Sequence, residues 1–209
     1  MKDSQRVTEM RRQREQLHRF AEWERTQGTE ELPVQLDTYQ AKEQEVRIQW
    51  LRQQVIGTVL EVGCNWGYVL AAVKGQAGVE INPYLVAVAR LLARDRQFFI
   101  GSALALPVPD ASYDTVMLPE VLEHLEWPDV PNAIAEARRV ARKRIIITIP
   151  DGEEETVEAT SFKHRWLCTR DRLDALCALL PTPTVTAEPP FLYIVARIDK
   201  RKEHEHERT

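Results

Sequence analysis

Short β-branched runs alternate with helical stretches along the chain after Gly57, and this alternation constrains the fold more than any other feature. Helical segments that separate short apolar strands are typical of a mostly parallel sheet that is buried on both faces. The sequence therefore predicts a doubly wound α/β domain. Its expected strands are Thr58–Val62, Gly78–Ile81, Phe98–Ile100, Thr115–Leu118 and Arg144–Ile149, and its expected helices are Tyr68–Lys74, Pro83–Asp95 and Val130–Ala141.

The C-terminal part of the predicted domain adds one more helix and a hairpin. Asp171–Leu180 is predicted as a helix that ends before Pro181 and Pro183. Phe191–Ile198 is predicted as the final strand, the second arm of a hairpin that turns through Pro189–Pro190. This strand is expected to be antiparallel to its partner in the hairpin.

Two flanking segments lie outside the predicted domain, which spans residues 55–198. Residues 1–54 are polar and helix-prone with a thin apolar stripe, so they are predicted as an N-terminal helical extension. Such an extension either packs against the core or forms a lid over the functional site. Residues 199–209 are nearly all charged and are predicted to be a disordered tail. The thin apolar stripe contains Val7, Met10, Leu17 and Phe20, and a second helical stretch carries Tyr39, Val46 and Trp50 on one face.

Charge and cysteine content narrow the function classes. A net charge of −4 argues against a protein that binds nucleic acid by bulk electrostatics, although it allows a local basic patch. Three unclustered cysteines favour neither a disulfide framework nor a zinc site. Without a membrane-length apolar run or a signal-like N-terminus, we expect a cytoplasmic protein with no membrane partner. One basic run fits either capping of a helix C-terminus or contact with a phosphate: Arg138, Arg139, Arg142, Lys143 and Arg144.

A glycine loop follows the first predicted strand, in the run Glu61-Val62-Gly63-Cys64-Asn65-Trp66-Gly67. Its glycines permit a tight turn and a close approach of backbone to a ligand, and a helix that begins there offers N–H groups. Glu80 lies 19 positions after Glu61, at the end of the second strand, where a carboxylate can accept hydrogen bonds from ribose hydroxyls. The spacing Glu-x-Gly-x-x-x-Gly differs from the dinucleotide fingerprint Gly-x-Gly-x-x-Gly.

A second motif follows the third predicted strand, in the run Gly101-Ser102-Ala103-Leu104-Ala105-Leu106-Pro107-Val108. With the glycine loop, it makes Val59–Pro150 resemble the class I S-adenosylmethionine (SAM) dependent methyltransferases, whose corresponding pattern is Gly-Asp-Ala-x-x-Leu-Pro-Phe. The resemblance implies a Rossmann-like sheet and SAM as cofactor. SAM has no pyrophosphate, so a dense phosphate-binding loop is not needed.

The resemblance also implies roles for single residues. Glu61, Gly63 and Gly67 would surround the methionine end of SAM, Glu80 would bind the ribose diol, and Ile81 would flank the adenine. Ser102 stands where relatives usually carry an Asp, so its hydrogen bond to the adenine amino group is expected to be weaker. The implied cofactor-binding residues are Glu61, Gly63, Asn65, Gly67, Glu80, Ile81, Ser102, Ala103 and Leu118.

A third group of polar residues follows the fourth predicted strand, in Leu118-Pro119-Glu120-Val121-Leu122-Glu123-His124-Leu125. If this segment opens a helix, Glu120, Glu123 and His124 share one face at i, i+3 and i+4. Two carboxylates and an imidazole at the carboxyl edge of a parallel sheet are placed for catalysis, and they also suit a divalent cation such as Mg²⁺ or Mn²⁺. These three are the predicted catalytic residues.

Together with His164-Arg165-Trp166-Leu167-Cys168-Thr169-Arg170, this segment resembles the metal-dependent 2′-O-methyltransferases of small RNAs. By that resemblance Glu120, Glu123, His124 and His164 would be metal ligands. The first three also match the quinone-biosynthesis O-methyltransferases, so they do not select RNA by themselves. Two further interpretations need no metal: His124 as a general base, and a structural role for these residues.

These patterns favour O-methyl transfer from SAM to a hydroxyl of a sugar-bearing or other small-molecule acceptor, glycans included. A bound cation could hold two neighbouring acceptor hydroxyls and stabilise the developing alkoxide. The alternatives are ribose 2′-O-methylation of RNA and, from a different class, a SAM-binding module without turnover. The acidic run Asp151–Glu155 and the absence of an RNA-binding domain argue against RNA.

Overall fold

The computed structural model describes residues 41–151, 165–166 and 168–198, with side chains from Glu45 onward. The chain divides into two compact units, Met1–Trp50 and Leu51–Thr209. The described part of the first unit is the beginning of helix α2 (Ala41–Gln54), which continues into the second. Most of the predicted extension and the whole predicted tail lie outside the described residues, so the lid and the disordered tail stay predictions.

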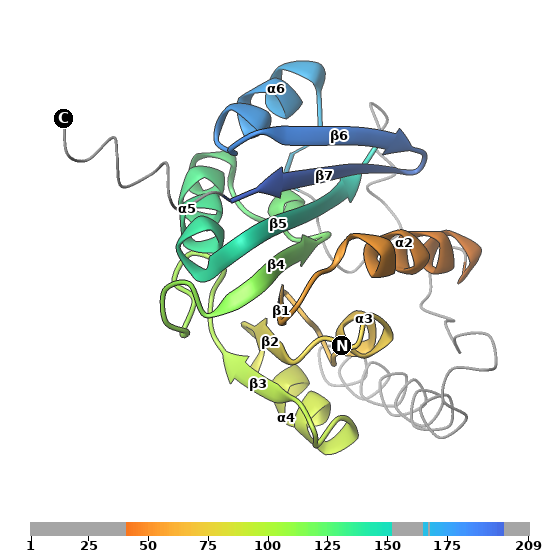
Figure 1. Cartoon of the computed structure of the whole chain (residues 1–209), viewed down its shortest axis with the longest axis vertical. Coiled ribbons are helices and arrows are strands. Elements are labelled where there is room, and N and C mark those ends of the chain that lie inside the picture. Colours follow the sequence, from red (N-terminus) through yellow and green to blue (C-terminus); the bar gives the residue numbers. More distant parts are fainter. Residues whose placement is uncertain (1–40, 152–164, 167, 199–209) are drawn as a thin grey trace, which may run out of the picture. The chain divides into compact units, whose positions relative to one another are not determined.

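The second unit contains a seven-stranded sheet with the strand order β3-β2-β1-β4-β5-β7-β6 (Figure 1). The first five strands in the chain pair in parallel, whereas β7 runs antiparallel to both β5 and β6. This order confirms the predicted doubly wound sheet with an antiparallel C-terminal hairpin. The strands are β1 (Val59–Val62), β2 (Ala77–Glu80), β3 (Gln97–Ile100), β4 (Tyr113–Pro119), β5 (Ala141–Pro150), β6 (Pro183–Glu188) and β7 (Phe191–Arg197).

Helices cover both faces of the sheet. Helices α3 (Tyr68–Ala72) and α5 (Val130–Val140) lie on opposite sides of it, and α4 (Pro83–Leu92) packs against β2 and β3 (Figure 1). Helix α6 (Arg170–Ala178) precedes the hairpin. Two short 3₁₀ helices, η1 (Leu122–His124) and η2 (Trp127–Asp129), follow β4.

The centre of the core is built by β-branched residues of the middle strands. In β5, the five residues Ile145–Ile149 are all buried, as expected for a parallel strand that is covered on both faces. Apolar side chains of α5, among them Ile134 and Ala137, pack into the same cluster. A rigid sheet of this kind fixes the positions of the loops at its edges.

Local sequence determines where the elements around the site begin and end. The Asn82 side chain accepts a hydrogen bond from the Tyr84 backbone N–H at 2.9 Å, and Pro83 occupies the first turn, so α4 begins directly after β2. The expected helices over Tyr68–Lys74 and Pro83–Asp95 end earlier, at Ala72 and Leu92. No helix in the described part of the chain is long and apolar enough to cross a membrane.

Candidate cofactor and acceptor site

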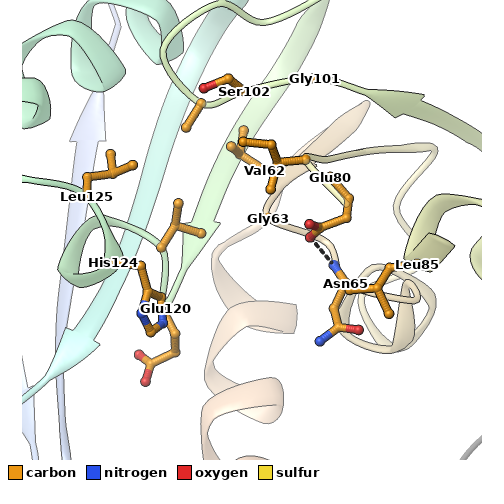
Figure 2. A pocket seen from close by; sticks show the side chains of 13 residues that line it. Val62, Gly63, Asn65, Glu80, Leu85, Gly101, Ser102, Glu120, His124 and Leu125 are labelled. Atoms are coloured by element: carbon orange, nitrogen blue, oxygen red, sulfur yellow. Dashed lines mark hydrogen bonds between the residues drawn. The ribbon is translucent and has the colours of Figure 1, made fainter. Parts of the chain in front are cut away.

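A pocket of about 350 Å³ opens at the carboxyl ends of β1, β2, β3 and β4 (Figure 2). This is the edge at which open α/β sheets bind their ligands. We call the residues from β1, β2, β3 and the segments that follow them the cofactor half: Val62, Gly63, Asn65, Glu80, Ile81, Leu85, Gly101, Ser102 and Ala103. The acceptor half, which follows β4, consists of Glu120, Val121, His124 and Leu125.

The glycine loop needs glycine at the place where the two halves meet. Gly63 has a φ of 68°, and a Cβ there would lie 2.6 Å from Cγ2 of Val121. Its backbone N–H donates to the Val79 carbonyl at 2.8 Å, which joins the loop to β2. Any side chain at this position would therefore be strained and would push against the acceptor half.

Glu80 is held at the end of β2 by two backbone amides. Its Oε2 accepts from the Asn65 N–H at 3.0 Å, drawn in Figure 2, and its Oε1 accepts from the Asn82 N–H at 2.9 Å. Asn65 itself has a φ of 51°, a left-handed conformation that Asn tolerates better than most residues. The carboxylate is thus fixed between the glycine loop and the start of α4, on the pocket wall, where it can accept further hydrogen bonds from a ligand.

Ser102 uses its hydroxyl within its own loop. The Oγ accepts from the Leu104 N–H at 3.1 Å, which shapes the turn after Gly101. One lone pair and the hydroxyl proton are left for a ligand. Ser102 can therefore donate to an adenine ring nitrogen as well as accept from its amino group.

The structure brings eight of the residues predicted from the sequence to this one pocket: Gly63, Asn65, Glu80, Ile81, Ser102, Ala103, Glu120 and His124. Glu61 and Leu118 do not line it, and both are buried within their strands at 2% and 1% exposure. Gly67 also lies off the pocket, at the start of α3, where a Cβ would meet the Phe98 ring at 2.9 Å. It is required there by packing.

Two carboxylates, those of Glu61 and Glu80, lie near Cys64 at the carboxyl ends of β1 and β2. The pKa of the Cys64 thiol is raised, mainly because the side chain is buried and also because the carboxylates of Glu61 and Glu80 lie near it. A thiol with a raised pKa stays protonated and is a poor nucleophile. Cys64 is therefore a packing residue beneath the cofactor half.

Glu120 occupies a strained position just after β4. Its φ is 55°, its backbone N–H donates to the Thr148 carbonyl at 3.0 Å, and the Thr148 hydroxyl donates to its Oε1 at 3.1 Å. Thr148 is completely buried in β5. The left-handed backbone and the two bonds together hold the carboxylate at the wall of the acceptor half.

The prediction that Glu120, Glu123 and His124 share one helical face is wrong. Glu120 precedes the 3₁₀ helix η1 and is outside it, because its left-handed φ interrupts any helix at that point. Glu123 is not among the residues that line the pocket and is 2% exposed. Of the three predicted catalytic residues, Glu120 and His124 line the pocket.

The predicted metal ligands do not form a site among the residues that the structure describes. Over residues 41–151, 165–166 and 168–198, no group of three or more His, Cys, Asp or Glu side chains could hold a metal ion. His164, the fourth predicted ligand, lies outside the described residues. Glu120 and His124 would therefore need further ligands from elsewhere to hold a cation.

Residues 165 and 166, from the predicted segment that also contains His164, contact η1. The Arg165 N–H donates to the Glu123 carbonyl at 2.7 Å, and the Trp166 indole N–H donates to the Leu122 carbonyl at 3.0 Å. Trp166 also packs edge-on against Trp127, with ring centroids 4.8 Å apart. These contacts fix the segment that carries His124.

Sequence reasoning missed several residues of the site. Val62, Leu85, Gly101, Val121 and Leu125 line the pocket with apolar or glycine surface. Val62, Gly101, Val121 and Leu125 are each adjacent in sequence to a predicted site residue, so including the sequence neighbours of the predicted residues would have found them. Leu85 lies in α4 and would have been missed. Thr148 gives no such signal, because it is 28 positions from Glu120 and reads as an ordinary strand residue.

Comparison with known proteins agrees with this geometry. Residues 60–148 match a sequence family described as a methyltransferase domain. Ajmaline N-methyltransferase of Rauvolfia serpentina is 27% identical in an alignment of 154 positions that covers 61% of this chain and 52% of that enzyme. The chain thus spans about half the length of the curated relative that it matches.

Solved structures of methyltransferases share the fold, and two of them serve as examples. A SAM-dependent methyltransferase from Thermotoga maritima is similar with a TM-score of 0.63 and 19% identity, over 73% of this chain and 87% of that one. Magnesium protoporphyrin IX methyltransferase from Synechocystis, with bound S-adenosylhomocysteine (SAH), is similar with a TM-score of 0.56 and 18% identity, over 76% and 83% of the two chains. At this identity the likeness extends to the fold alone.

Proposed function

We propose that this chain, whose residues 60–148 match a methyltransferase domain, transfers the methyl group of SAM to a hydroxyl of a small-molecule acceptor. A sugar-bearing molecule is our first choice. The observation that carries the proposal is the single pocket that joins the fixed carboxylate of Glu80 to Glu120 and His124. Its volume of about 350 Å³ lies at the lower end of the range of small-molecule sites.

The cofactor half fits SAM. Its fixed carboxylate suits a ribose diol, its exposed apolar residue Ile81 suits one face of an adenine, and the Ser102 hydroxyl suits the edge of that ring. When bound, SAM supplies a methyl group that its sulfonium has already activated. What this chain must add is alignment of the acceptor and removal of its proton.

The acceptor half supplies the groups for both tasks. The His124 imidazole lines the pocket and can accept the proton that the hydroxyl loses as its oxygen forms the new bond to carbon. Glu120, held by Thr148, can accept a hydrogen bond from a second donor group of the acceptor and so orient it. We assign His124 as the base and Glu120 as the orienting residue.

This assignment uses no metal ion. The described residues offer no cluster of three ligands, and Glu123 is buried away from the pocket lining. A cation held by Glu120, Glu123, His124 and His164 would require a different arrangement of this segment. We expect turnover to survive EDTA and to gain little from Mn²⁺ or Mg²⁺; abolition by EDTA with recovery in Mn²⁺ would instead establish the metal-dependent mechanism.

Radiolabelled SAM tests the activity itself. The full chain is mixed with labelled SAM and separate pools of sugars, phenols and short RNAs, and label is followed into each pool. We expect transfer to a sugar or phenol pool and tight binding of SAH by titration calorimetry. Binding of SAH without transfer to any pool would favour the non-catalytic SAM-binding module, whereas transfer to RNA alone would favour ribose 2′-O-methylation.

A further inference from the structure

We propose that the acceptor half selects a neutral or cationic acceptor and rejects one that carries a phosphate or carboxylate beside the reacting hydroxyl. This inference rests on the methyltransferase activity proposed above and names the class of its acceptor. It follows from the charges that line the pocket and from how they are held.

The charged side chains of the pocket lining are acidic. Glu80 and Glu120 line it, together with the titratable His124, and no Lys or Arg does so in the described part of the chain. Proteins bind phosphate and carboxylate groups with Arg, Lys or clustered backbone N–H groups. An anionic acceptor would meet like charge here, in a site partly shielded from water, where the repulsion is stronger than in bulk solvent.

The carboxylate of Glu120 is fixed at the wall of the pocket. Thr148, fully buried in β5, donates its hydroxyl to Oε1, and the left-handed backbone of Glu120 is held by a second bond to the Thr148 carbonyl. A fixed carboxylate accepts hydrogen bonds and does not donate them while ionised. Its natural partners in an acceptor are hydroxyl and ammonium groups.

Two arginines near η1, Arg165 and Arg172, are in contact with other groups. Arg165 pairs with Glu126 at 3.4 Å. The guanidinium of Arg172 lies 5.4 Å from the ring centre of Trp127 and 5.8 Å from that of Trp166. Neither arginine lines the pocket.

Matched acceptors of different charge test the inference. Tyramine, tyrosol and 4-hydroxyphenylacetate share a phenol and carry a positive, a neutral and a negative tail; glucosamine, methyl glucoside and glucuronate form the same series for sugars. Each is titrated into the SAH-saturated full chain by ligand-observed NMR, and turnover is followed with labelled SAM. We expect the neutral and cationic members to bind at least about tenfold more tightly than the anionic one, as for one charge about 6 Å away at intermediate dielectric.

Two further measurements tie the preference to Glu120. In Glu120→Gln the difference between tyramine and 4-hydroxyphenylacetate should fall below about threefold, while SAH binds as in the wild type. If that variant does not fold, raising the salt concentration on the wild type should narrow the difference, because salt screens charge.

Equal or tighter binding of the anionic members overturns the inference, as does a preference that neither Glu120→Gln nor salt alters. It is also overturned if no member of either series binds to the SAH-saturated chain. Failure to bind SAM or SAH at all would instead refute the proposed function.

Discussion

A carboxylate lies at each end of β4, and the two differ in their partners: one is paired with a cation, and the other accepts from a neutral hydroxyl and faces the pocket. At the start of the strand, Asp114 accepts from the Thr58 backbone N–H at 3.0 Å and from the Lys143 ammonium at 3.0 Å. These contacts lower the pKa of Asp114 to about 2. At the other end, Glu120 accepts from the buried Thr148 hydroxyl and faces the pocket.

The basic run of residues 138–144 belongs to the first of these ends. Arg139 pairs with Glu136 and Asp110, each at 2.7 Å, and Arg142 donates to the carbonyls of Ala111 and Ser112, each at 2.6 Å. These contacts tie the loop before β4 to the end of α5. These contacts differ from both interpretations of this run, so capping of a helix C-terminus and contact with a phosphate stay predictions.

The two ends of β4 thus differ in role: one stabilises the fold, and the other lines the pocket. Opposite charges meet at the start of the parallel strands, far from the pocket, and stabilise the fold. Acidic groups gather at the carboxyl ends, where the pocket lies, and there they are available to a ligand. Substitutions at the two ends should therefore change different measurements, and the predictions below test this division.

The largest effect is expected at His124. If it removes the acceptor proton, His124→Ala should lower kcat by at least about 100-fold, the usual contribution of a general base. The Kd of SAH should stay within about twofold, because His124 lies in the acceptor half. Asp114→Asn is the matched control, since it removes a carboxylate at the other end of β4. A variant at His124 that retains most of its kcat would contradict the assignment.

Glu80 should control cofactor affinity. Glu80→Ala removes the acceptor of two backbone N–H groups and the expected ribose ligand, so SAH binding should weaken by about 1.5–3 kcal/mol in titration calorimetry. Glu80→Gln should be nearly as damaging, because its amide N–H₂ would face one of these backbone donors. Unchanged affinity in both variants would show that Glu80 does not bind the ribose.

Asp114 should control stability and its dependence on pH. Its folded-state pKa, about 2, lies below the ordinary 3.8, so the stabilisation is present above pH 3.8 and is lost as the pH falls through about 2. The difference corresponds to about 2 kcal/mol at neutral pH. Urea unfolding of Asp114→Asn should therefore show a loss of this size at pH 7 that shrinks towards pH 2. A loss independent of pH would point to packing instead of charge.

The cofactor half was largely predictable from the sequence because its bonds are local. Glu80 is 15 positions from Asn65 and two from Asn82, and these contacts follow from a glycine loop, a strand end and a helix start. The alternation of strands and helices likewise predicted the sheet, including its C-terminal hairpin. What failed there were element ends, such as α4 ending at Leu92.

The acceptor half was less predictable because its geometry depends on residues far apart. The helical spacing of Glu120, Glu123 and His124 suggested one shared face, but the backbone of Glu120 turns left-handed where it meets β5. The contact of Trp166 with the Leu122 carbonyl spans 44 positions. No local pattern encodes such contacts.

The smallest effect, and the finest test of the comparison, is expected at Thr148. It is fully buried and lines no part of the pocket, so it can act on turnover only through Glu120. Thr148→Val keeps the β-branched shape but removes the hydroxyl, and losing one hydrogen bond to a carboxylate should cost roughly 1.5–3 kcal/mol at most, and less where water replaces the donor.

We therefore expect kcat/KM to fall several-fold in Thr148→Val, with the Kd of SAH unchanged. Thr148→Ser retains the donor and should recover most of the activity, although it loses a methyl group from the core and some thermal stability. A merely structural role predicts the reverse order, because serine leaves the larger cavity. Thr148→Ser less active than Thr148→Val would thus place Thr148 with Asp114 among the residues that stabilise the fold, and would remove it from the support of the acceptor half.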